Sequence, residues 1–422
     1  MGRMLKPWLG ALALAAASAA AWPAEIRVHP GESIAAAVVR AAAGDTVAVE
    51  RGRYEEHVRI DKPLTLRGIG RPTLSGGLVG DTIRITAPDV TVQGLIVTDS
   101  GDDLGAQNAG IYIQPGADRV VVKDCDIIYN LFGLWIEGVK APQATGNLIA
   151  GKRDYASAQR GNGIQLYNTT GAQIIGNTIS FSRDGIYVDV SDHAVFRGNK
   201  IHDVRYGTHY MNSHHNLWED NEVYHSRTGL ALMEVRNQVV RNNRAWGNSD
   251  AGIMLRTIQD SVIENNVVAG NQRGFFIYDA EYNVVRNNVV ADNDVGAHVS
   301  AGSIHNDVQG NDFIGNRQQV RYVAAKDERW GGKAGNYWSN YVGWDRNGDG
   351  VGDVPYEAND VVDRLIWRLP MVKLLFNSPA IHTLRLIAQQ FPLLRAPSIV
   401  DTVPRMRPAH GSWSRWMGKQ HD

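Results

Sequence analysis

Short apolar runs, each broken by polar turn-forming residues, repeat at a fixed interval between residues 163 and 316. In the first repeat the runs begin at Gly163, Gln173 and Asn177, and each has the character of a short β-strand. Glycines mark the repeats at intervals of 22, 22, 22, 23, 22 and 22 residues: Gly163, Gly185, Gly207, Gly229, Gly252, Gly274 and Gly296. A fixed period of roughly 20 to 50 residues is typical of stacked structural units, so the pattern predicts a solenoid.

A second series of residues keeps the same interval and consists of asparagines: Asn177, Asn199, Asn221, Asn243, Asn266, Asn288 and Asn311. We expect their amides to stack as a hydrogen-bonded ladder inside the turns. The leucine skeleton and helical half of leucine-rich repeats are missing. We therefore predict an all-β fold, a right-handed parallel β-helix with coils of about 22 residues, in which each coil adds one strand per sheet about 4.8 Å from the last.

The start of the chain has the features of a secretory signal over Met1–Ala21. Arg3 and Lys6 precede an apolar run, and small residues follow it. We therefore expect export, to the periplasm in a Gram-negative host. Beyond the signal, composition predicts four segments: an N-terminal cap with a short helix and the first strands (22–71), the β-helix (72–325), a loop region rich in aromatic residues, Asp and Gly (326–360), and a basic amphipathic C-terminal tail with short helices (361–422).

One coil is longer than the others. The interval from Asn147 to Asn177 is 30 residues instead of 22, which places an eight-residue insertion within 150–161. Insertions in solenoids form loops on one face, which is often the binding face. The segment 102–108 is expected to be a second such loop.

Overall charge and cysteine content exclude some classes of function. The 43 basic and 44 acidic residues of the 422-residue chain give a net charge of −1, which does not suggest a nucleic-acid partner. Basic residues are concentrated at the C-terminal end, where 361–422 holds nine Lys or Arg and three Asp. The single cysteine, Cys125, excludes an intrachain disulfide and a thiolate cluster, and we expect it to be a packed core thiol.

Candidate chemistry emerges when the repeats are aligned on their glycines. The first and third residues after each glycine are apolar and should face the interior, so the second and fourth should face outward. In that arrangement His209 and Met211 lie on one strand, Met233 on the next and Met254 on the one after, all on one outer face. Thioether and imidazole ligands without thiolate suit Cu(I) in an exported protein. The pattern therefore predicts a copper site.

Two further histidines, His214 and His215, follow closely in the chain and are included as candidate copper ligands. An alternative interpretation is that methionine and histidine only line an aromatic groove that packs against another element. Outward-facing methionine on a solenoid needs some partner in either case. Both interpretations stay open from the residue pattern.

The segment 345–353 has the D-x-N-x-D-G spacing of a calcium loop, with Asp345, Asn347, Asp349 and Asp353 as candidate ligands. The twelfth position holds Tyr356 where an EF-hand has a bidentate glutamate, so it is not a complete EF-hand. A structural calcium turn and an ordinary aspartate-rich turn are both open.

Exported β-helices also include polysaccharide lyases and C5-epimerases acting on uronate polymers, which is the alternative function. Such a site needs an acid, a base and a cation along one groove. The candidates would be Asp189, Arg256 and Tyr278, which the repeats separate by several coils, with methionines between them.

A helix is predicted near the C-terminus. Ser378 and Pro379 form an N-cap and first-turn pair, apolar residues recur at helical spacing, and Pro392 ends the run.

Several blocks together resemble one family. They are Gly335-Asn-Tyr-Trp-Ser-Asn-Tyr, Asn347-Gly-Asp-Gly-Val-Gly-Asp-Val-Pro-Tyr, Leu374-Leu-Phe-Asn-Ser-Pro-Ala and Gln389-Gln-Phe-Pro-Leu-Leu-Arg. With the glycine and asparagine repeats, they make nearly the whole mature chain similar to the NosD family, periplasmic accessory proteins for maturation of nitrous oxide reductase.

The resemblance implies a non-enzymatic role in assembling the copper–sulfur centres of that reductase. The implied partners are the reductase, a copper chaperone, and the permease and ATPase of an ABC transporter. It provides no ligand residues, so the copper candidates depend on the alignment of the repeats alone. A cationic, amphipathic tail suits docking on a membrane permease, and the candidates for that contact are Ile381, Leu384, Arg385, Ala388 and Phe391.

Overall fold

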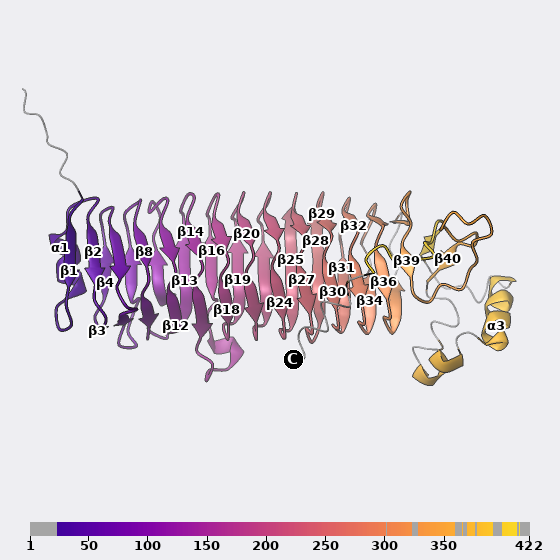
Figure 1. Cartoon of the computed structure of the whole chain (residues 1–422), viewed down its shortest axis with the longest axis horizontal. Coiled ribbons are helices and arrows are strands. Elements are labelled where there is room, and N and C mark those ends of the chain that lie inside the picture. The colour runs from indigo at the N-terminus through magenta and orange to yellow at the C-terminus, as the bar shows by residue number, and fades with distance from the viewer. Residues whose placement is uncertain are drawn as a thin grey trace, which may run out of the picture.

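The chain winds into a long parallel β-helix with three sheets along its length (Figure 1). The computed structural model describes residues 23–300, 302–322, 328–358, 365, 369–375, 378–390, 399–411 and 413. The predicted signal, Met1–Ala21, therefore lies outside the described residues. The predicted fold class is confirmed, because each coil contributes one strand to each sheet and neighbouring strands pair in parallel.

Sheet A has 16 strands, and all its pairs are parallel except that of β40 with β41. In spatial order its strands are β1 (Glu25–Val28), β2 (Thr46–Val49), β5 (Thr65–Gly68), β8 (Thr91–Gln93), β11 (Val121–Lys123), β14 (Gln143–Thr145), β17 (Gln173–Ile175), β20 (Val195–Arg197), β23 (Leu217–Glu219), β26 (Val239–Arg241), β29 (Val262–Glu264), β32 (Val284–Arg286), β35 (Asp307–Gln309), β38 (Arg329–Trp330), β41 (Val400–Asp401) and β40 (Tyr356–Glu357).

Sheet B has 13 strands. They are β3 (Arg53–Glu55), β6 (Thr73–Ser75), β9 (Ile96–Thr98), β12 (Asp126–Asn130), β15 (Leu148–Gly151), β18 (Thr178–Ser180), β21 (Lys200–His202), β24 (Glu222–Tyr224), β27 (Arg244–Trp246), β30 (Val267–Ala269), β33 (Val289–Ala291), β36 (Asp312–Ile314) and β39 (Tyr337–Trp338).

Sheet C has 12 strands and carries the candidate site. From the N-terminal end they are β4 (Val58–Ile60), β7 (Ile83–Ile85), β10 (Ala109–Ile113), β13 (Phe132–Glu137), β16 (Ile164–Tyr167), β19 (Asp184–Asp189), β22 (Tyr206–Met211), β25 (Thr228–Arg236), β28 (Ala251–Gln259), β31 (Arg273–Tyr278), β34 (Val295–Val299) and β37 (Gln318–Tyr322).

One continuous apolar core fills the coil. Inward-facing residues of all three sheets stack in columns, as Ile174, Phe196 and Trp218 do on sheet A. Cys125 is fully buried in this core, where burial raises the pKa of its thiol to about 11. The prediction of a packed core thiol is confirmed.

The asparagine ladder is present as predicted. The side-chain amide of Asn221 donates to the side-chain oxygen of Asn243 at 2.9 Å, and the same contact recurs from coil to coil. Each amide also donates to a backbone carbonyl, as that of Asn221 does to Phe196. The ladder starts earlier than predicted, at Asn147, and continues to Asn336. It satisfies buried backbone groups that the tight turns leave without strand partners.

The repeated glycines stand where sheets B and C approach closely. A Cβ atom on Gly185 would lie 2.4 Å from a methyl carbon of Ile201 and 2.6 Å from the carbonyl oxygen of Gly207 in the next coil. Only glycine allows this approach, which accounts for its strict period.

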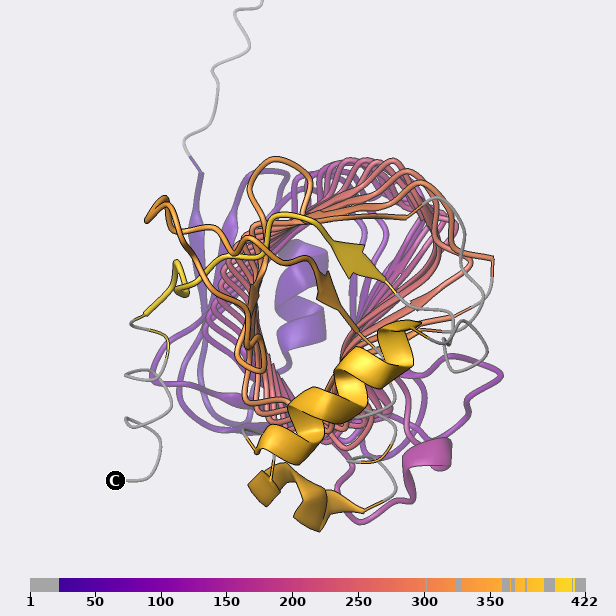
Figure 2. The ribbon, with the colours of Figure 1, turned by 90° about the vertical axis from the view of Figure 1, so that its right-hand side faces the viewer.

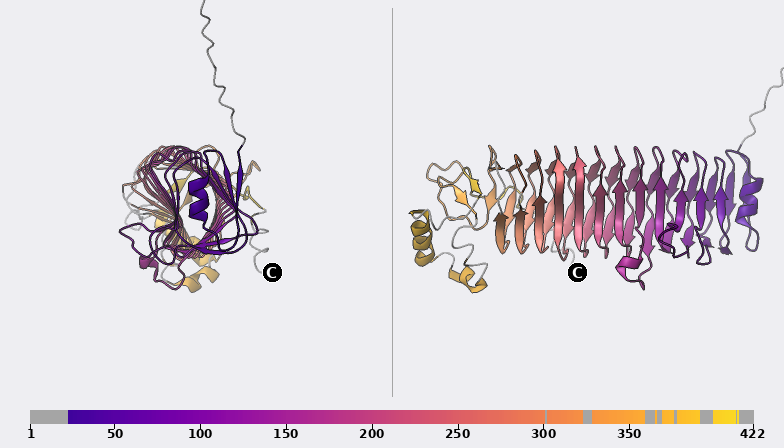
Figure 3. Two further views of the ribbon diagram at one scale, coloured as in Figure 1. Left: turned by 90° about the vertical axis from the view of Figure 1, so that its left-hand side faces the viewer. Right: turned by 180° about the vertical axis from the view of Figure 1, so that it is seen from behind.

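A short helix, α1 (Ile34–Arg40), covers the N-terminal end of the coil (Figure 3). The hydroxyl of Ser33 accepts a hydrogen bond from the Ala36 amide, and Ile34, Ala37 and Val38 are buried. The segment 22–71 thus contains the helix and the first strands of all three sheets.

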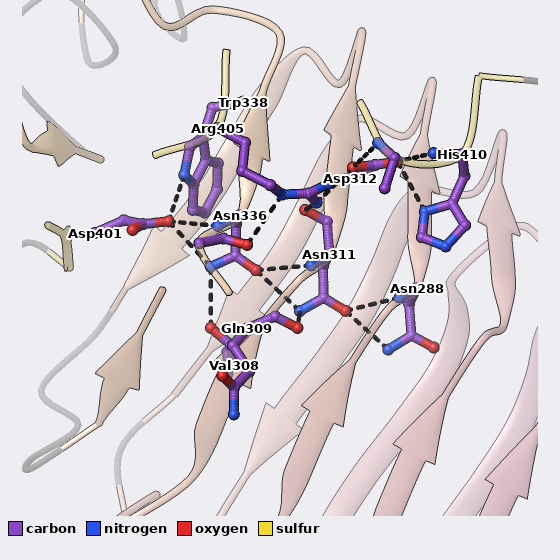
Figure 4. A network of polar contacts seen from close by, with 12 residues as sticks. Asn288, Val308, Gln309, Asn311, Asp312, Asn336, Trp338, Asp401, Arg405 and His410 are labelled. Atoms are coloured by element: carbon purple, nitrogen blue, oxygen red, sulfur yellow. Dashed lines mark hydrogen bonds and ion pairs between the residues drawn. The ribbon is translucent and has the colours of Figure 1, made fainter. Parts of the chain in front are cut away.

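The C-terminal end of the coil is closed by a segment from much later in the chain. We expected residues 361–422 to form a docking tail; of these, residues 399–411 and 413 pack against the coil. The carboxylate of Asp401 accepts hydrogen bonds from the backbone and side-chain amides of Asn336, at 2.9 and 3.1 Å, and from the Trp338 indole (Figure 4). It supplies the acceptor that a further asparagine would have supplied, so it ends the ladder.

Besides α1, the described residues include the short helical segments η1 (Ser157–Gln159), η2 (Pro370–Leu375) and α3 (Pro379–Gln390). The helix predicted after Ser378 is confirmed as α3, which lies at the C-terminal end of the coil (Figure 2). Among the described helices, none has the length and apolar character needed to cross a bilayer.

Candidate functional site

The outer face of sheet C carries a continuous column of side chains, all large except one alanine. In register from β16 to β34 it holds Gln165, Tyr187, His209, Ala231, Met254, Phe276 and His298. The neighbouring column includes Tyr167, Asp189 and Met211, and farther along Met233 beside Arg256. The two outward columns were predicted from the glycine spacing.

The structure brings four of the candidate copper ligands to one flank. His209 and Met211 lie on β22, Met233 on β25 and Met254 on β28. Met233 and Met254 are each only 8% exposed, yet they are not part of the internal core. They pack with Ala231, Tyr206 and Phe276 in a small cluster on the outside of the sheet.

The sulfur atoms of Met211 and Met233 make only weak contacts. The Tyr187 hydroxyl lies 3.6 Å from the Met211 sulfur, and a guanidinium nitrogen of Arg256 lies 3.9 Å from the Met233 sulfur. Thioethers are weak acceptors, so these contacts are easily replaced. Ala231 lies between His209 and Met254 in the column, and its small side chain packs against the flexible side chains of Met233 and Met254.

His209 is oriented by a buried carboxylate. Its Nδ1 lies 3.0 Å from Asp184, and Arg205 forms two hydrogen bonds to the same carboxylate, at 2.8 and 2.6 Å. Burial alone would raise the pKa of Asp184, but the hydrogen bonds from His209 and Arg205 hold this pKa below its ordinary value. The Arg205 guanidinium also lies 3.3 Å from Nδ1, but the carboxylate is closer, and an ionised Asp184 only accepts. In the neutral ring we therefore assign the proton to Nδ1, and Nε2 then carries the lone pair that a metal ion could use.

The sequence analysis missed Asp184 and Arg205, although a signal existed. Asp184 stands one residue before Gly185 and Arg205 two residues before Gly207, and the alignment considered only positions after each glycine. With Tyr187 and His209 they line a groove of about 480 Å³ on this face, together with Phe132, Trp135 and Glu137.

The structure does not bring His214 and His215 to this face. Both follow the end of β22, and His215 has a left-handed backbone with φ of 55°. The His214 Nδ1 accepts from the Arg236 amide at 3.2 Å, and the His215 ring stacks on His193 with centroids 5.2 Å apart. The two histidines therefore belong to a turn beside the sheet, because the strand ends before them.

The predicted calcium loop is folded as an aspartate-rich turn. Asp345 accepts hydrogen bonds from the amides of Gly348, Asp349 and Gly350, at 2.7 to 3.2 Å. Asp353 accepts from the Arg346 amide at 2.7 Å, and the Asn347 amide donates to Asp349. In the described part of the chain, no group of three or more His, Cys, Asp or Glu is placed to hold a metal ion, and this loop is included in that statement. Calcium binding here stays a prediction.

The residues expected to contact a permease lie on or after α3. Ile381 is buried and Leu384 is half-buried. The side chains of Arg385 and Ala388, and Phe391 as a whole, lie outside the described residues.

The residues considered for uronate chemistry are not gathered together. Arg256 and Tyr278 are paired on β28 and β31, whereas Asp189 lies on β19, three strands before β28. Three strand spacings amount to about 14 Å. The alternative of a uronate lyase or epimerase therefore gains no site from these three residues and stays untested.

Comparison with known proteins places the chain in a family. Residues 145–343 match a family described as "Periplasmic copper-binding protein (NosD)". A Pseudomonas aeruginosa protein named probable ABC transporter binding protein NosD is 39% identical over 371 residues, covering 84% of this chain and 87% of that protein. A Stutzerimonas stutzeri protein of the same name is 39% identical over 372 residues, covering 84% and 85%.

The chain belongs to the NosD family.

Solved structures share the NosD coil at low sequence identity. The Dettilon tailspike protein aligns with a TM-score of 0.52 at 13% identity, over 71% of this chain and 68% of its own. The Streptococcus pneumoniae surface protein and adhesin PfbA aligns with a TM-score of 0.53 at 11% identity, over 69% and 94%. These likenesses concern the fold alone. The NosD relatives, by contrast, are named as binding proteins, in keeping with the expected non-enzymatic role.

Proposed function

We propose that this NosD-family protein binds Cu(I) as cargo on the outer face of sheet C and passes it on during maturation of nitrous oxide reductase. The observation that carries the proposal is the placement of His209, Met211, Met233 and Met254 on one flank, outside the core. Three thioethers and one imidazole form a soft ligand set, which suits a soft monovalent ion.

The protein supplies orientation as well as donors. Asp184 fixes the His209 ring through Nδ1, an arrangement that metal-binding histidines share. Adjacent strands are about 4.8 Å apart, and methionine has three rotatable bonds, so thioethers from β22, β25 and β28 can turn towards one ion. Copper held mainly by thioethers on the outer face of the sheet, without thiolate, would also be available for transfer to a partner.

The proposed docking partner is the permease of an ABC transporter, with the ATPase, a copper chaperone and the reductase in the same assembly. Two observations support docking through the C-terminal end. Leu369, Met371, Leu374 and Leu375, on and beside η2, are 57%, 73%, 79% and 58% exposed. Contiguous exposed apolar side chains need a partner, and the relatives are named for an ABC transporter. The proposed location is the periplasm, as the family description states for the family.

Copper binding is tested by competition with a chromophoric Cu(I) chelator, under anaerobic reducing conditions, on the mature protein. The decisive variant replaces Met211, Met233 and Met254 by leucine, which removes sulfur but keeps volume and apolar character. We expect the variant to lose at least about tenfold in Cu(I) affinity, equal to about 1.4 kcal/mol.

The matched control is Met371→Leu, which removes one thioether from an exposed position on η2, outside the three sheets. It should bind Cu(I) as the parent does. Parent-like affinity in the triple variant would remove the proposed site, and the four side chains would then only line a packing surface. His209→Gln should weaken binding while leaving the methionine cluster packed.

A further inference from the structure

Three arginines stand in register at the edge of sheet C, in successive coils. Arg183, Arg205 and Arg227 are 22 residues apart, and each is the residue immediately before a strand of sheet C: β19, β22 and β25 respectively. The Arg205 amide donates to the Arg183 carbonyl oxygen at 2.8 Å, which fixes the register. Like charges side by side on neighbouring strands are destabilising, so such a column needs compensating negative charge.

The insertion in the long coil covers this column. η1 and the residue after it, Arg160, form one wall of a hollow of about 480 Å³, and the arginine column forms another. In Figure 1 the insertion projects from the coil just below β18. The charged and hydroxyl groups that line the hollow are Ser157, Arg160, Ser182, Arg183, Asp203, Arg205 and Arg227.

The insertion is held in place by a buried lysine. Lys152, which is 1% exposed, is ion-paired with Asp102 and donates to the Ser100 carbonyl oxygen at 3.1 Å. The Tyr155 hydroxyl donates to the same carboxylate at 2.8 Å. The two loops that the sequence predicted on the binding face therefore support each other, and they keep Arg160 beside the column.

Two of the four arginines have no carboxylate of a described residue within ion-pair distance, and the one carboxylate that lines the hollow, Asp203, lies 2.7 Å from the His202 Nδ1 instead. Arg205 is neutralised by the buried Asp184, and Arg227 lies 3.8 Å from Asp250, which also pairs with Arg273. The Arg160 guanidinium donates only to the carbonyl oxygens of Tyr155 and Arg153, both at 2.8 Å, and these carry no charge. Arg183 is exposed, and no carboxylate of a described residue lies within ion-pair distance of it.

We propose that this hollow binds a small oxyanion with two negative charges, of the sulfate, thiosulfate or phosphate type. Arg160 and Arg183 would be its main ligands, because a guanidinium presents paired N–H donors that match oxyanion geometry. Four guanidinium groups against one carboxylate, Asp203, leave the lining of the hollow positively charged, which favours an anion of two charges. The column spans two strand spacings, about 10 Å, a size that favours a small ion over a polymer chain.

The test is titration calorimetry of the full mature protein with sodium sulfate, thiosulfate and phosphate, in a buffer of low chloride. We expect one site per chain, with affinity that falls as sodium chloride is added. The Arg160→Gln/Arg183→Gln variant should bind at least about tenfold more weakly. Arg183→Lys should bind more weakly than the parent but more tightly than Arg183→Gln, because lysine keeps the positive charge but lacks the paired N–H donors of the guanidinium.

The matched control is Arg59→Gln, at an exposed arginine on β4 of the same sheet, which removes the same charge far from the hollow. It should stay within about twofold of the parent, since screened charges at that distance contribute little. Equal weakening by Arg59→Gln and Arg183→Gln would show a diffuse field and overturn the site. Absence of saturable binding by all three anions, or binding of oligouronate alone, would also overturn it. Thermal unfolding verifies that each variant is folded. If the Arg160→Gln/Arg183→Gln variant does not fold, the single variant Arg183→Gln decides the test.

Discussion

The network around Asp312 leads to a prediction about how the C-terminal segment is held to the coil. Asp312 is fully buried on β36, and its partners lie 93 to 98 residues later in the chain. It accepts from Arg405 at 2.7 Å, from the amides of Ala409 and His410 at 3.2 and 2.8 Å, and from the His410 ring at 2.8 Å (Figure 4). Asp312→Asn keeps the shape of the side chain and removes its charge.

The size of the effect follows from these contacts. Arg405 is 17% exposed, so the variant leaves a largely buried guanidinium without its counter-charge. Breaking a buried pair costs about 3 to 5 kcal/mol. Taking about 3 kcal/mol, the opening equilibrium of residues 399–411 should rise by roughly a hundredfold. Solenoid contacts are local, so the central coils should not be affected.

The pH dependence has a definite sign. Burial would raise the pKa of Asp312, but the hydrogen bonds from His410 and the charge of Arg405 hold it below its ordinary value. A lowered carboxyl pKa stabilises the folded form above the ordinary value of about 3.9, and this contribution is lost as the pH falls through the lowered pKa. The parent segment should therefore stay closed at neutral pH and loosen only in strong acid.

Hydrogen exchange followed by mass spectrometry is the assay. Peptides within 399–411 should exchange roughly a hundredfold faster in Asp312→Asn at pH 7, and peptides from the central coils should not change. The control is Asp89→Asn, which removes an exposed pair with Arg119, where both side chains are at least 50% exposed. Such a pair contributes at most about 1 kcal/mol. Exchange in 399–411 within about threefold of the parent would refute the reasoning, as would equal acceleration throughout the coil.

Three further predictions concern the coil itself. Asn221→Leu leaves the Phe196 carbonyl without a donor and the backbone and side-chain amides of Asn199 without an acceptor. The free energy of unfolding in urea should therefore fall by about 2 to 5 kcal/mol, whereas Lys200→Ala, on the outside of the coil, should leave it almost unchanged. Gly207→Ala brings a Cβ to 2.3 Å from a Val223 methyl carbon and 2.6 Å from the Gly229 oxygen, so its urea midpoint should fall by the equivalent of at least about 1 to 3 kcal/mol; unchanged stability would contradict the close approach. Burial raises the pKa of Glu328 to about 7, so the stability of the parent should decrease as the pH rises from about 4.5 to 7. Glu328→Gln should remove this decrease and be more stable than the parent at pH 8 by about 1 to 3 kcal/mol in thermal unfolding. Parallel pH profiles of the two proteins would contradict this prediction.

The repeated part of the chain was determined by the sequence alone. In a parallel coil with in-register strands, residues one period apart become neighbours, so aligning the repeats amounts to a map of the sheets. That map predicted the β-helix, the asparagine ladder and the outward columns that contain His209, Met211, Met233 and Met254, whereas the reason for the glycines, the close approach of sheets B and C, came from the structure.

Only the tertiary structure decided what the period does not encode. The turn after β22 carries His214 and His215 away from the sheet, the insertion places Arg160 over an arginine column, and Asp184 orients His209 from a neighbouring coil. Asp401, Arg405 and His410 reach back across 65 to 98 residues to close the coil. Such contacts depend on the path of loops and tails, which no repeat constrains, so only the folded chain reveals them.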